Sequence, residues 1–252
     1  MTDRALSFGS GAADYERHRP GYPDQLVDAV LGYAGRPVRT ALEIGAGTGK
    51  ATRVFVAAGI DVLATDPDAG MLAELRRHVP ATVRTRRAAL EELDGAGTFD
   101  LVFAAAALHW TEPTGRWPRV ASLLADGGVF ASFGGQVELA DPAVAVAVGR
   151  ARAPFLADDG VPAPDGTSPE AAMQWPGSEL QGSDAFTDVR QVVIERRRMM
   201  SAADYLAHLG TISAYRVLAD DVRAQAFASI AEVLPDHVEL TVDLVLHLAR
   251  RA

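Results

Sequence analysis

The first half of the chain alternates short strand-like runs with amphipathic stretches. The strand-like runs are 40–44, 60–65, 82–86, 99–104 and 129–133. Helical spacing of apolar residues falls between them, at about 50–58, 68–79 and 117–124. Strands that alternate with helices are typical of a parallel sheet covered on both faces. The pattern therefore predicts an α/β fold whose strand-to-helix loops open at one edge, where a ligand belongs.

The pattern changes after residue 138. Asp141-Pro142 is a good N-cap and N1 pair and predicts a helix over 143–152, although alternating valines there also fit a strand. Prolines and glycines crowd 154–182 without periodicity, which is typical of a lid, a binding loop or a disordered segment. The remaining pattern predicts a strand over 189–196, helices over 201–209 and 220–234, and a last strand over 238–248.

The segment before the first core strand contains two closely spaced prolines. Pro20 and Pro23 bracket a rigid turn, and Asp24 is expected to cap a helix from Gln25 to about Gly32. With these boundaries the chain divides into four segments: an amino-terminal lid 1–38, a cofactor-binding core 39–137, a lid or insertion 138–188, and carboxyl-terminal strands and helices 189–252 that complete the sheet and a cap.

Composition narrows the functional classes. The chain has 252 residues, 48% of them hydrophobic, which is enough for one large core. Its net charge of −9 disfavours a nucleic-acid surface. It has no cysteine, so disulfides, thiolate zinc sites and thiol nucleophiles are excluded. The sequence shows no long apolar span or apolar leader, and we expect a cytoplasmic protein without a membrane partner.

Glycines at alternate positions follow the first core strand. Residues 43–50 read Glu-Ile-Gly-Ala-Gly-Thr-Gly-Lys, and Asp66 comes 21 residues after Gly45. A phosphate-binding P-loop would need glycine at Ile44 and Ser or Thr at Ala51. A dinucleotide fingerprint would need its last glycine at Lys50. Neither pattern is present, so what remains is a glycine turn between two acids, with Asp66 placed to accept ribose hydroxyls.

This arrangement resembles the class I S-adenosylmethionine-dependent methyltransferases. The resemblance extends to Tyr-x-x-x-Arg-Pro-x-Tyr-Pro at 15–23, Phe-Asp-Leu-Val at 99–102, and Leu-His-Trp at 108–110. It implies a doubly wound, Rossmann-like methyltransferase sheet, mostly parallel with an antiparallel carboxyl-terminal edge strand, plus a helical lid. Where the family places an acid that binds adenine, this chain has Ala89, which puts that contact in doubt while the Leu90 amide is kept.

The resemblance also implies a set of cofactor-binding residues. Tyr15, Arg19 and Tyr22 would form a lid over the methionine end, unless that segment is a surface helix packed on the core. The full set is Tyr15, Arg19, Tyr22, Glu43, Gly45, Ala46, Gly47, Gly49, Asp66, Pro67, Met71, Ala89, Leu90, Glu91, Ala104, Ala105 and His109.

Fewer residues are candidates for chemistry on the acceptor. His109 follows the fourth strand and is the candidate general base, with a structural histidine beside Trp110 as the alternative. An acceptor pocket is predicted from Trp110, Trp175, Tyr205, Ser213 and Tyr215, which are equally well explained as core residues. The run Arg196-Arg197-Arg198 is interpreted as a solvated strand edge.

Together these features predict an enzyme that transfers a methyl group from S-adenosyl-L-methionine to a small-molecule acceptor and releases S-adenosyl-L-homocysteine, without a metal. In-line displacement needs alignment of donor and acceptor more than covalent help from the enzyme. We expect a monomer or homodimer and no nucleic-acid partner. The alternatives are a relative that binds the cofactor for a non-methylating reaction or for regulation, and a nicotinamide-dependent oxidoreductase.

Overall fold

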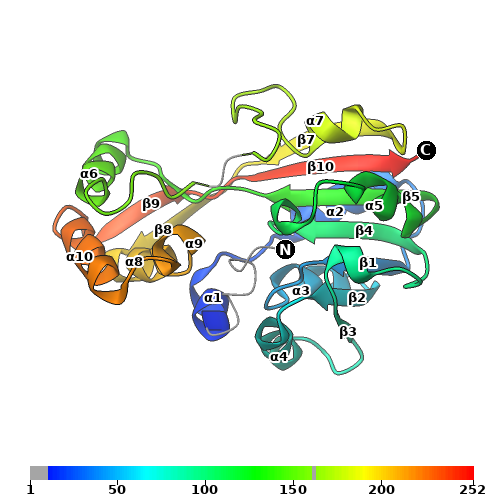
Figure 1. Cartoon of the computed structure of the whole chain (residues 1–252), viewed down its shortest axis with the longest axis horizontal. Helices are drawn as coiled ribbons and strands as arrows, with labels where there is room; N and C mark the ends of the chain where they lie inside the picture. The colour runs from blue at the N-terminus through cyan, green and yellow to red at the C-terminus, as the bar shows by residue number, and fades with distance from the viewer. Residues whose placement is uncertain (1–10, 161–162) are drawn as a thin grey trace.

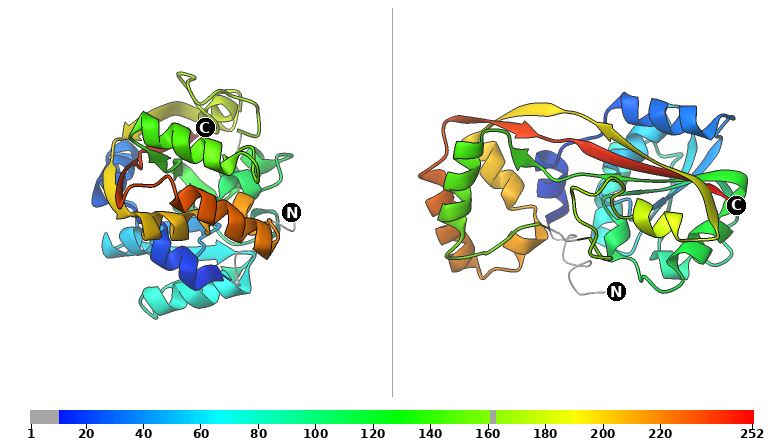
Figure 2. Two further views of the ribbon diagram at one scale, coloured as in Figure 1. Left: turned by 90° about the vertical axis from the view of Figure 1, so that its left-hand side faces the viewer. Right: turned by 90° about the horizontal axis from the view of Figure 1, so that it is seen from above.

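A large α/β core and a smaller cap form the two ends of the molecule (Figure 1). The computed structural model describes residues 11–160 and 163–252. In Figures 1 and 2 the cap carries helices α6, α8, α9 and α10, while helix α1, Ala12–His18, lies between cap and core. The chain passes between the two parts along β5–β6, β7–β8 and β9–β10, so the cap is built on extensions of the core strands.

The core is a seven-stranded sheet with the order β3-β2-β1-β4-β5-β10-β7. Neighbours from β3 to β5 pair in parallel, and β10 runs antiparallel to both β5 and β7. The predicted fold class is therefore confirmed, with the antiparallel strand paired to the strand at the edge. The strands are β1 Thr40–Ile44, β2 Asp61–Asp66, β3 Arg84–Arg87, β4 Phe99–Ala105, β5 Leu124–Gly134, β7 Phe186–Ile194 and β10 Leu244–Arg251.

Helices cover both faces because side chains of the central strands alternate between two apolar clusters. Ala41 packs on one face and Leu42 on the other, and both are fully buried. The first face is covered by α2 Asp24–Ala34, α3 Lys50–Ala57 and α4 Ala69–His78. The second face is covered by α5 Arg116–Ser122, α7 Gly177–Gln181 and the 3₁₀ turns η2 Leu90–Glu92 and η3 Leu108–Trp110.

The cap has its own small sheet and its own core. Its strands, in the order β6-β9-β8, pair antiparallel. Tyr215, Ile230 and Leu240 are fully buried between this sheet and the helices, and make the centre of the cap. Its elements are β6 Glu138–Leu139, α6 Pro142–Arg152, β8 Arg197–Ser201, α8 Ala202–Leu209, α9 Ser213–Arg216, α10 Asp220–Ala231 and β9 His237–Thr241.

Several predicted elements are confirmed with their local causes. The first strand and the helix after the glycine turn lie where they were predicted. Asp141 accepts from the Ala143 and Val144 amides, which settles 142–152 as a helix. Ser201 likewise caps α8 through the Asp204 amide, at 3.1 Å. Strand β3 starts later than predicted, and β2 extends to Asp66.

Other predictions are wrong. The single strand over 238–248 is two strands, β9 and β10, because the chain crosses from cap to core at Val242 and Asp243. The cap residue of α2 is Pro23, and Asp24 is its first helical residue. The strand predicted over 129–133 is longer, Leu124–Gly134, and it includes Gly127 and Gly128, where the pairing with β4 shifts register. The segment 154–182, apart from 161–162 outside the described residues, contains helix α7.

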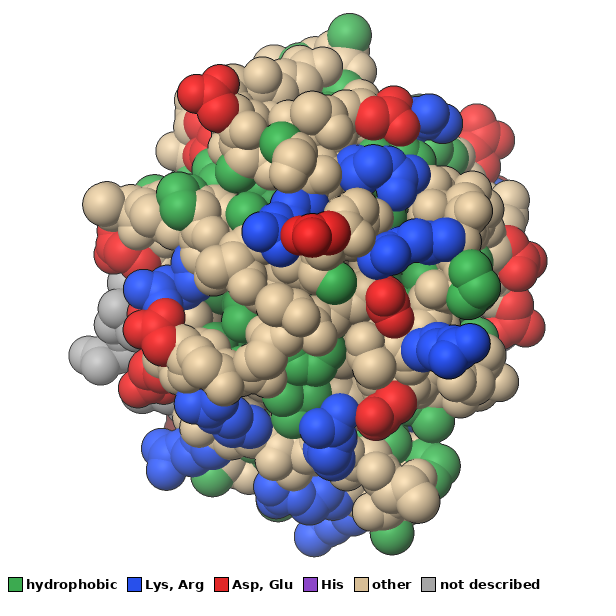
Figure 3. All heavy atoms as spheres, turned by 90° about the vertical axis from the view of Figure 1, so that its right-hand side faces the viewer, with side chains coloured by type: hydrophobic (Ala, Val, Ile, Leu, Met, Phe, Trp, Pro, Cys, Tyr) green, Lys and Arg blue, Asp and Glu red, His purple; other side chains and the backbone are tan. Residues whose placement is uncertain are grey.

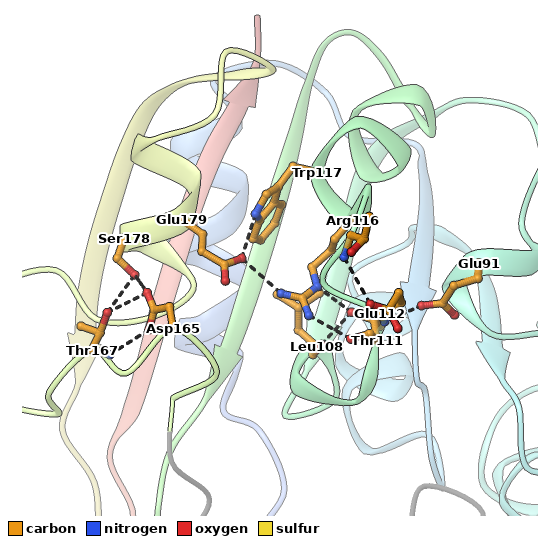
Figure 4. A network of polar contacts seen from close by, with 11 residues as sticks. Glu91, Leu108, Thr111, Glu112, Arg116, Trp117, Asp165, Thr167, Ser178 and Glu179 are labelled. Atoms are coloured by element: carbon orange, nitrogen blue, oxygen red, sulfur yellow. Dashed lines mark hydrogen bonds and ion pairs between the residues drawn. The ribbon is translucent and has the colours of Figure 1, made fainter. Parts of the chain in front are cut away.

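A buried ion pair attaches this irregular segment to the core (Figure 4). The Arg116 side chain is fully buried, and its Nη1 lies 3.1 Å from Oε2 of Glu179 at α7. Trp117 Nε1 donates to the same oxygen at 2.9 Å. The guanidinium also donates to the hydroxyl and carbonyl of Thr111 and lies over the Trp175 ring. The buried guanidinium is therefore paired with a carboxylate, which is what a buried charge requires.

The four-part division of the chain stays a prediction. Residues 1–10 of its amino-terminal segment lie outside the described residues.

Candidate functional site

The glycine turn joins β1 to α3 at the carboxyl edge of the sheet. Gly45, Gly47 and Gly49 have φ of +66°, +56° and +85°, values that favour glycine. A Cβ at Gly45 would lie 2.4 Å from the Ala107 Cβ, and one at Gly49 2.8 Å from Leu75 Cγ. At Gly47 a Cβ would meet no heavy atom within 4 Å. Gly45 and Gly49 therefore allow close packing, while Gly47 leaves the turn bare toward open space.

That open space is a pocket of about 700 Å³, open to solvent on one side. It lies over the ends of β1, β4 and β5, the usual ligand position in an open α/β sheet. Four walls enclose it: the segment from α1 to α2, the glycine turn, the ends of β4 and β5, and the chain crossings to the cap. Its lining is Tyr15, 19–22, 45–48, Lys50, Ala51, Ala105, Ala106, 134–137, Arg196 and 242–244.

Asp66 lies at the end of β2, directly behind the glycine turn. Its Oδ2 accepts from the Gly47 amide at 2.9 Å, and its Oδ1 from the Asp68 amide at 2.8 Å. Burial raises the pKa of Asp66 to about 6, against the opposing effect of these two amides. The carboxylate thus fixes the turn and keeps lone pairs for another donor, as an acid that binds ribose hydroxyls requires.

Glu43 is completely buried beneath the same turn. Its Oε2 accepts from the Thr52 hydroxyl at 2.5 Å, while Oε1 has no hydrogen-bond partner among the described residues. Burial raises the pKa of Glu43 to about 8, and the Asp66 charge adds to that effect. A buried polar atom without a partner is uncommon, and here it lies under the floor of the pocket.

Helix α1 is attached to the glycine turn through one carboxylate. Glu16 Oε2 accepts from the Thr48 hydroxyl at 2.7 Å, and Oε1 from Arg53 Nη1 at 2.8 Å. Lys50 Nζ donates to the Glu16 carbonyl at 2.6 Å. On the other side of α1, Arg19 donates from Nε to the Thr211 hydroxyl at 2.8 Å. The helix therefore bridges the cofactor turn and the cap, as a lid would.

Two chain crossings hold Arg196 at the pocket wall. The Arg196 amide donates to Asp243 Oδ1 at 2.7 Å, and its carbonyl accepts from the Val242 amide at 3.0 Å. A Cβ at Gly135 would lie 1.9 Å from the Asp243 carbonyl oxygen, so β5 can pass the crossing only with glycine there. Arg196 was interpreted as part of a solvated edge. The structure corrects this for Arg196, while Arg197 and Arg198 are exposed.

Seven of the predicted cofactor residues line the pocket, and the other ten are not in its lining. Those in the lining are Tyr15, Arg19, Tyr22, Gly45, Ala46, Gly47 and Ala105. Gly49 is part of the turn, while Glu43 and Asp66 lie behind it. Met71 and Ala104 are buried in the core, and Leu90 is buried in η2. Pro67, Ala89 and Glu91 are partly exposed, and Glu91 Oε1 accepts from the Glu112 amide at 2.7 Å. Direct contact of any of these with a cofactor stays a prediction.

The candidate base and acceptor residues do not lie in this lining. His109 is in η3, its ring 4.6 Å from the Trp110 ring, and burial together with Arg116 lowers its pKa to about 4. Trp175 packs on the core cluster beside Arg116. Tyr205 and Tyr215 belong to the apolar core of the cap, and Ser213 is buried at the start of α9. The structure therefore separates the five predicted acceptor residues into two groups.

Several lining residues escaped the sequence reasoning. Ala106, which has a φ of +50°, lies at the end of β4, and the segment 134–137 lies at the end of β5. The ends of the predicted strands were therefore the sequence signal that could have indicated these residues. Arg196 and Asp243 line the pocket because two chain crossings that are far apart in the sequence meet there. No pattern in the residues next to them predicts that contact.

Two further observations concern metal ligands and membrane-spanning helices in the described part of the chain. There, no group of three or more His, Asp or Glu residues is placed to hold a metal ion. None of the helices in residues 11–160 and 163–252 has the length and apolar character needed to cross a membrane. On the face that carries the core end of the molecule, acidic and basic side chains are interspersed (Figure 3).

Comparison with known proteins gives consistent matches. A family model described as a methyltransferase domain matches residues 42–130. An uncharacterized methyltransferase of Mycobacterium tuberculosis is 44% identical over 126 residues, which is 50% of this chain and 51% of the relative. A probable S-adenosylmethionine-dependent methyltransferase of Saccharomyces cerevisiae is 31% identical over 127 residues, 48% of this chain and 44% of the relative. The match thus spans about half the length of each of these relatives.

A solved structure extends the likeness to nearly the whole chain. A putative type II methyltransferase from Anaeromyxobacter dehalogenans superimposes with a TM-score of 0.65 at 24% identity, and the match covers 92% of this chain and 97% of that one. At this identity the likeness concerns the fold, cap included.

Proposed function

Because the chain carries a methyltransferase domain of the class I S-adenosylmethionine-dependent family, we propose that it transfers a methyl group from S-adenosyl-L-methionine to a small-molecule acceptor. The observation that carries the proposal is the bare glycine turn at Gly47, backed by Asp66 and open to the pocket. The acceptor occupies the same pocket, beneath the lid formed by α1 and the turn after it.

The residues present fit this cofactor. Gly47 has room on its open side for a ligand to approach the backbone. The Asp66 carboxylate has lone pairs left to accept hydrogen bonds from two ribose hydroxyls. Glu43 Oε1, beneath the turn, has no hydrogen-bond partner among the described residues. Arg19 lines the pocket and makes no ion pair with a carboxylate of the described residues, so it can bind the carboxylate of a methionine moiety. No phosphate has to be bound, which agrees with the absence of a P-loop.

When bound, the cofactor supplies an electrophilic methyl group on a sulfonium. The chain's own residues hold the two reactants in line, and positioning of this kind supplies roughly 7–11 kcal/mol of a bimolecular barrier. Tyr15 and Tyr22 close the pocket from the lid side and exclude water. Tyr22 packs edge-to-face on Phe133, with ring centres 5.1 Å apart, which fixes that wall.

The remaining parts of the proposal rest on composition. The net charge of −9 supports a small-molecule partner over a nucleic-acid partner, and a cytoplasmic location is part of the proposal. We also propose that the reaction needs no metal and that the protein is a monomer or a homodimer. A cofactor-binding relative that does not methylate is the alternative.

The test is turnover of a methyl donor labelled with deuterium. The purified protein is incubated with the labelled donor and a small-molecule extract, and both S-adenosyl-L-homocysteine and labelled products are measured by mass spectrometry. Formation of both in equal amounts is the expected result. Tight binding of the donor without either product would favour the non-methylating alternative, and binding of NAD alone would refute the proposal.

A further inference from the structure

The pocket lining has more positively charged side chains than carboxylates that face them. Two cations of the neighbourhood are compensated: Lys50 lies 3.5 Å from Glu16 Oε1, and Arg53 lies 2.8 Å from the same oxygen. The lining carboxylate Asp243 faces Arg197, with 3.8 Å from Oδ1 to Nη1. Arg19 and Arg196 have no carboxylate partner among the described residues. Two uncompensated arginines in one pocket are notable in a chain with a net charge of −9.

The two arginines come from different parts of the chain. Arg19 follows α1, the helix attached to the glycine turn, and so belongs to the cofactor side. Arg196 lies at the crossings to the cap, and its side chain reaches the segment between α1 and α2. Its side chain donates from Nη1 to the Gly21 carbonyl at 3.0 Å. A guanidinium has five N–H donors, so most of this one remains available to a planar anion.

Among the described lining residues, the groups that could remove a proton are few. None of its described residues is a histidine, and Asp243 Oδ1 already accepts from the Arg196 amide. Burial raises the pKa of Tyr22, which makes its phenol a poorer acid and gives it no proton-accepting role. His109 lies outside the lining, and its lowered pKa makes it a weak base. The pocket therefore suits a nucleophile that is already deprotonated at neutral pH.

From the guanidinium of Arg196, which has donors to spare beyond its bond to the Gly21 carbonyl, and from a lining without histidine, we propose that the acceptor is a small carboxylic acid whose carboxylate is converted to a methyl ester. Arg196 orients the acid as a positioning residue through a charge-assisted contact. A carboxylate oxygen forms the new bond to the methyl carbon as the bond from that carbon to sulfur breaks. The electron pair stays on sulfur, the charges of carboxylate and sulfonium cancel, and no proton moves.

This inference rests on the proposed methyl transfer, and its test separates the two. A small-molecule extract is divided by ion exchange into acidic, neutral and basic fractions, and each is incubated with the protein and the deuterated methyl donor. The expected result is a labelled product from the acidic fraction alone. Mild alkali should release its label as methanol, because esters hydrolyse where N-methyl, C-methyl and ether products survive.

Three variants test Arg196 itself. Arg196→Gln should lower the rate at limiting acid about tenfold or more, the loss expected for a charge-assisted contact. Its affinity for S-adenosyl-L-homocysteine, measured by calorimetry, should stay within about twofold of that of the wild type. Arg196→Lys keeps the charge and should recover part of the rate. Arg150→Gln removes an equal charge from an exposed position on α6 and should change neither quantity.

The outcomes are distinguishable. A labelled product from the neutral or basic fraction, or a label that alkali does not release, overturns the carboxylate acceptor and leaves methyl transfer standing. An Arg196→Gln variant with unchanged acid kinetics, or with weaker cofactor binding alone, overturns the role of Arg196. No label in any fraction from protein that binds the donor refutes the proposed methyl transfer, and this inference falls with it.

Discussion

The attachment of helix α1 through Glu16 leads to a prediction whose size follows from the structure. Glu16→Gln keeps the shape of the side chain but removes the charge that faces Lys50 and Arg53. The wild-type carboxylate is 15% exposed, and it accepts from Thr48 and Arg53 at 2.7 and 2.8 Å. The variant should weaken the docking of α1 on the glycine turn without unfolding the core.

Hydrogen bonds to a charged group contribute about 1.5–3 kcal/mol each when well formed. Partial exposure of Arg53 reduces that value, and the Gln oxygen still accepts one bond, which leaves a loss of about 1–2 kcal/mol. A loss of this size is roughly a 5- to 30-fold change in the equilibrium between docked and undocked α1.

The pH dependence of this docking follows from the same contacts. Burial raises the pKa of Glu16, but the bonds from Thr48 and Arg53 and the Lys50 charge outweigh it, so the pKa lies below its ordinary value of 4.5. The stabilisation from Glu16 is therefore complete at neutral pH and is lost as pH falls below about 4.5 through the lowered pKa.

Amide hydrogen exchange measured by mass spectrometry on the α1 peptide tests the prediction. Protection should fall by the stated factor in Glu16→Gln, and cofactor affinity should fall with it, because Tyr15 and Arg19 line the pocket. Glu74→Gln, which alters a surface pairing with Arg77 and His78 on α4, is the matched control. Equal protection of α1 in the wild type and in both variants would show that Glu16 does not hold the helix.

Three further predictions concern the pocket and the core. Asp66→Ala should weaken donor binding by about tenfold or more, and His109→Ala by less, as measured by calorimetry. The reason is that, of these two residues, Asp66 is the one that contacts the glycine turn. Equal effects would mean that the pocket is misplaced. Burial raises the pKa of Glu43 to about 8, so the stability this residue contributes is complete below pH 4.5 and is lost as pH rises through 8. Between about pH 6 and 9 the melting temperature should therefore fall less in Glu43→Gln than in the wild type. Identical pH profiles of the two proteins would contradict the assignment. Glu179→Ala should lower the free energy of unfolding in urea by about 3 kcal/mol, because Arg116 would stay buried without its carboxylate, and a loss below about 1 kcal/mol would disprove that dependence.

The sequence predicted best the elements whose cause is local. The first strand, the glycine turn and helix α3 follow from one apolar run and three glycines, and helices α6 and α8 from capping residues beside them. The antiparallel strand pair followed from the family resemblance and is present as β7 and β10.

What the sequence missed depends on contacts between distant segments. The apolar alternation over 238–248 continues through Val242, so nothing local marks the point where the chain leaves the cap sheet for the core sheet. Arg196 lies at the pocket because that crossing meets the one after β7, which no pattern around the three arginines indicates. Tyr205 and Tyr215 have the composition of a binding pocket but fill the core of the cap, because four short helices need apolar contacts there.

A crystal structure of the protein with S-adenosyl-L-homocysteine would test the central claim most directly. Our account predicts the ligand against the backbone of residues 45–49, with its ribose hydroxyls within hydrogen-bond distance of Asp66 and its carboxylate beside Arg19. Ligand bound elsewhere on the protein, or a glycine turn that stays empty at saturating concentration, would contradict it.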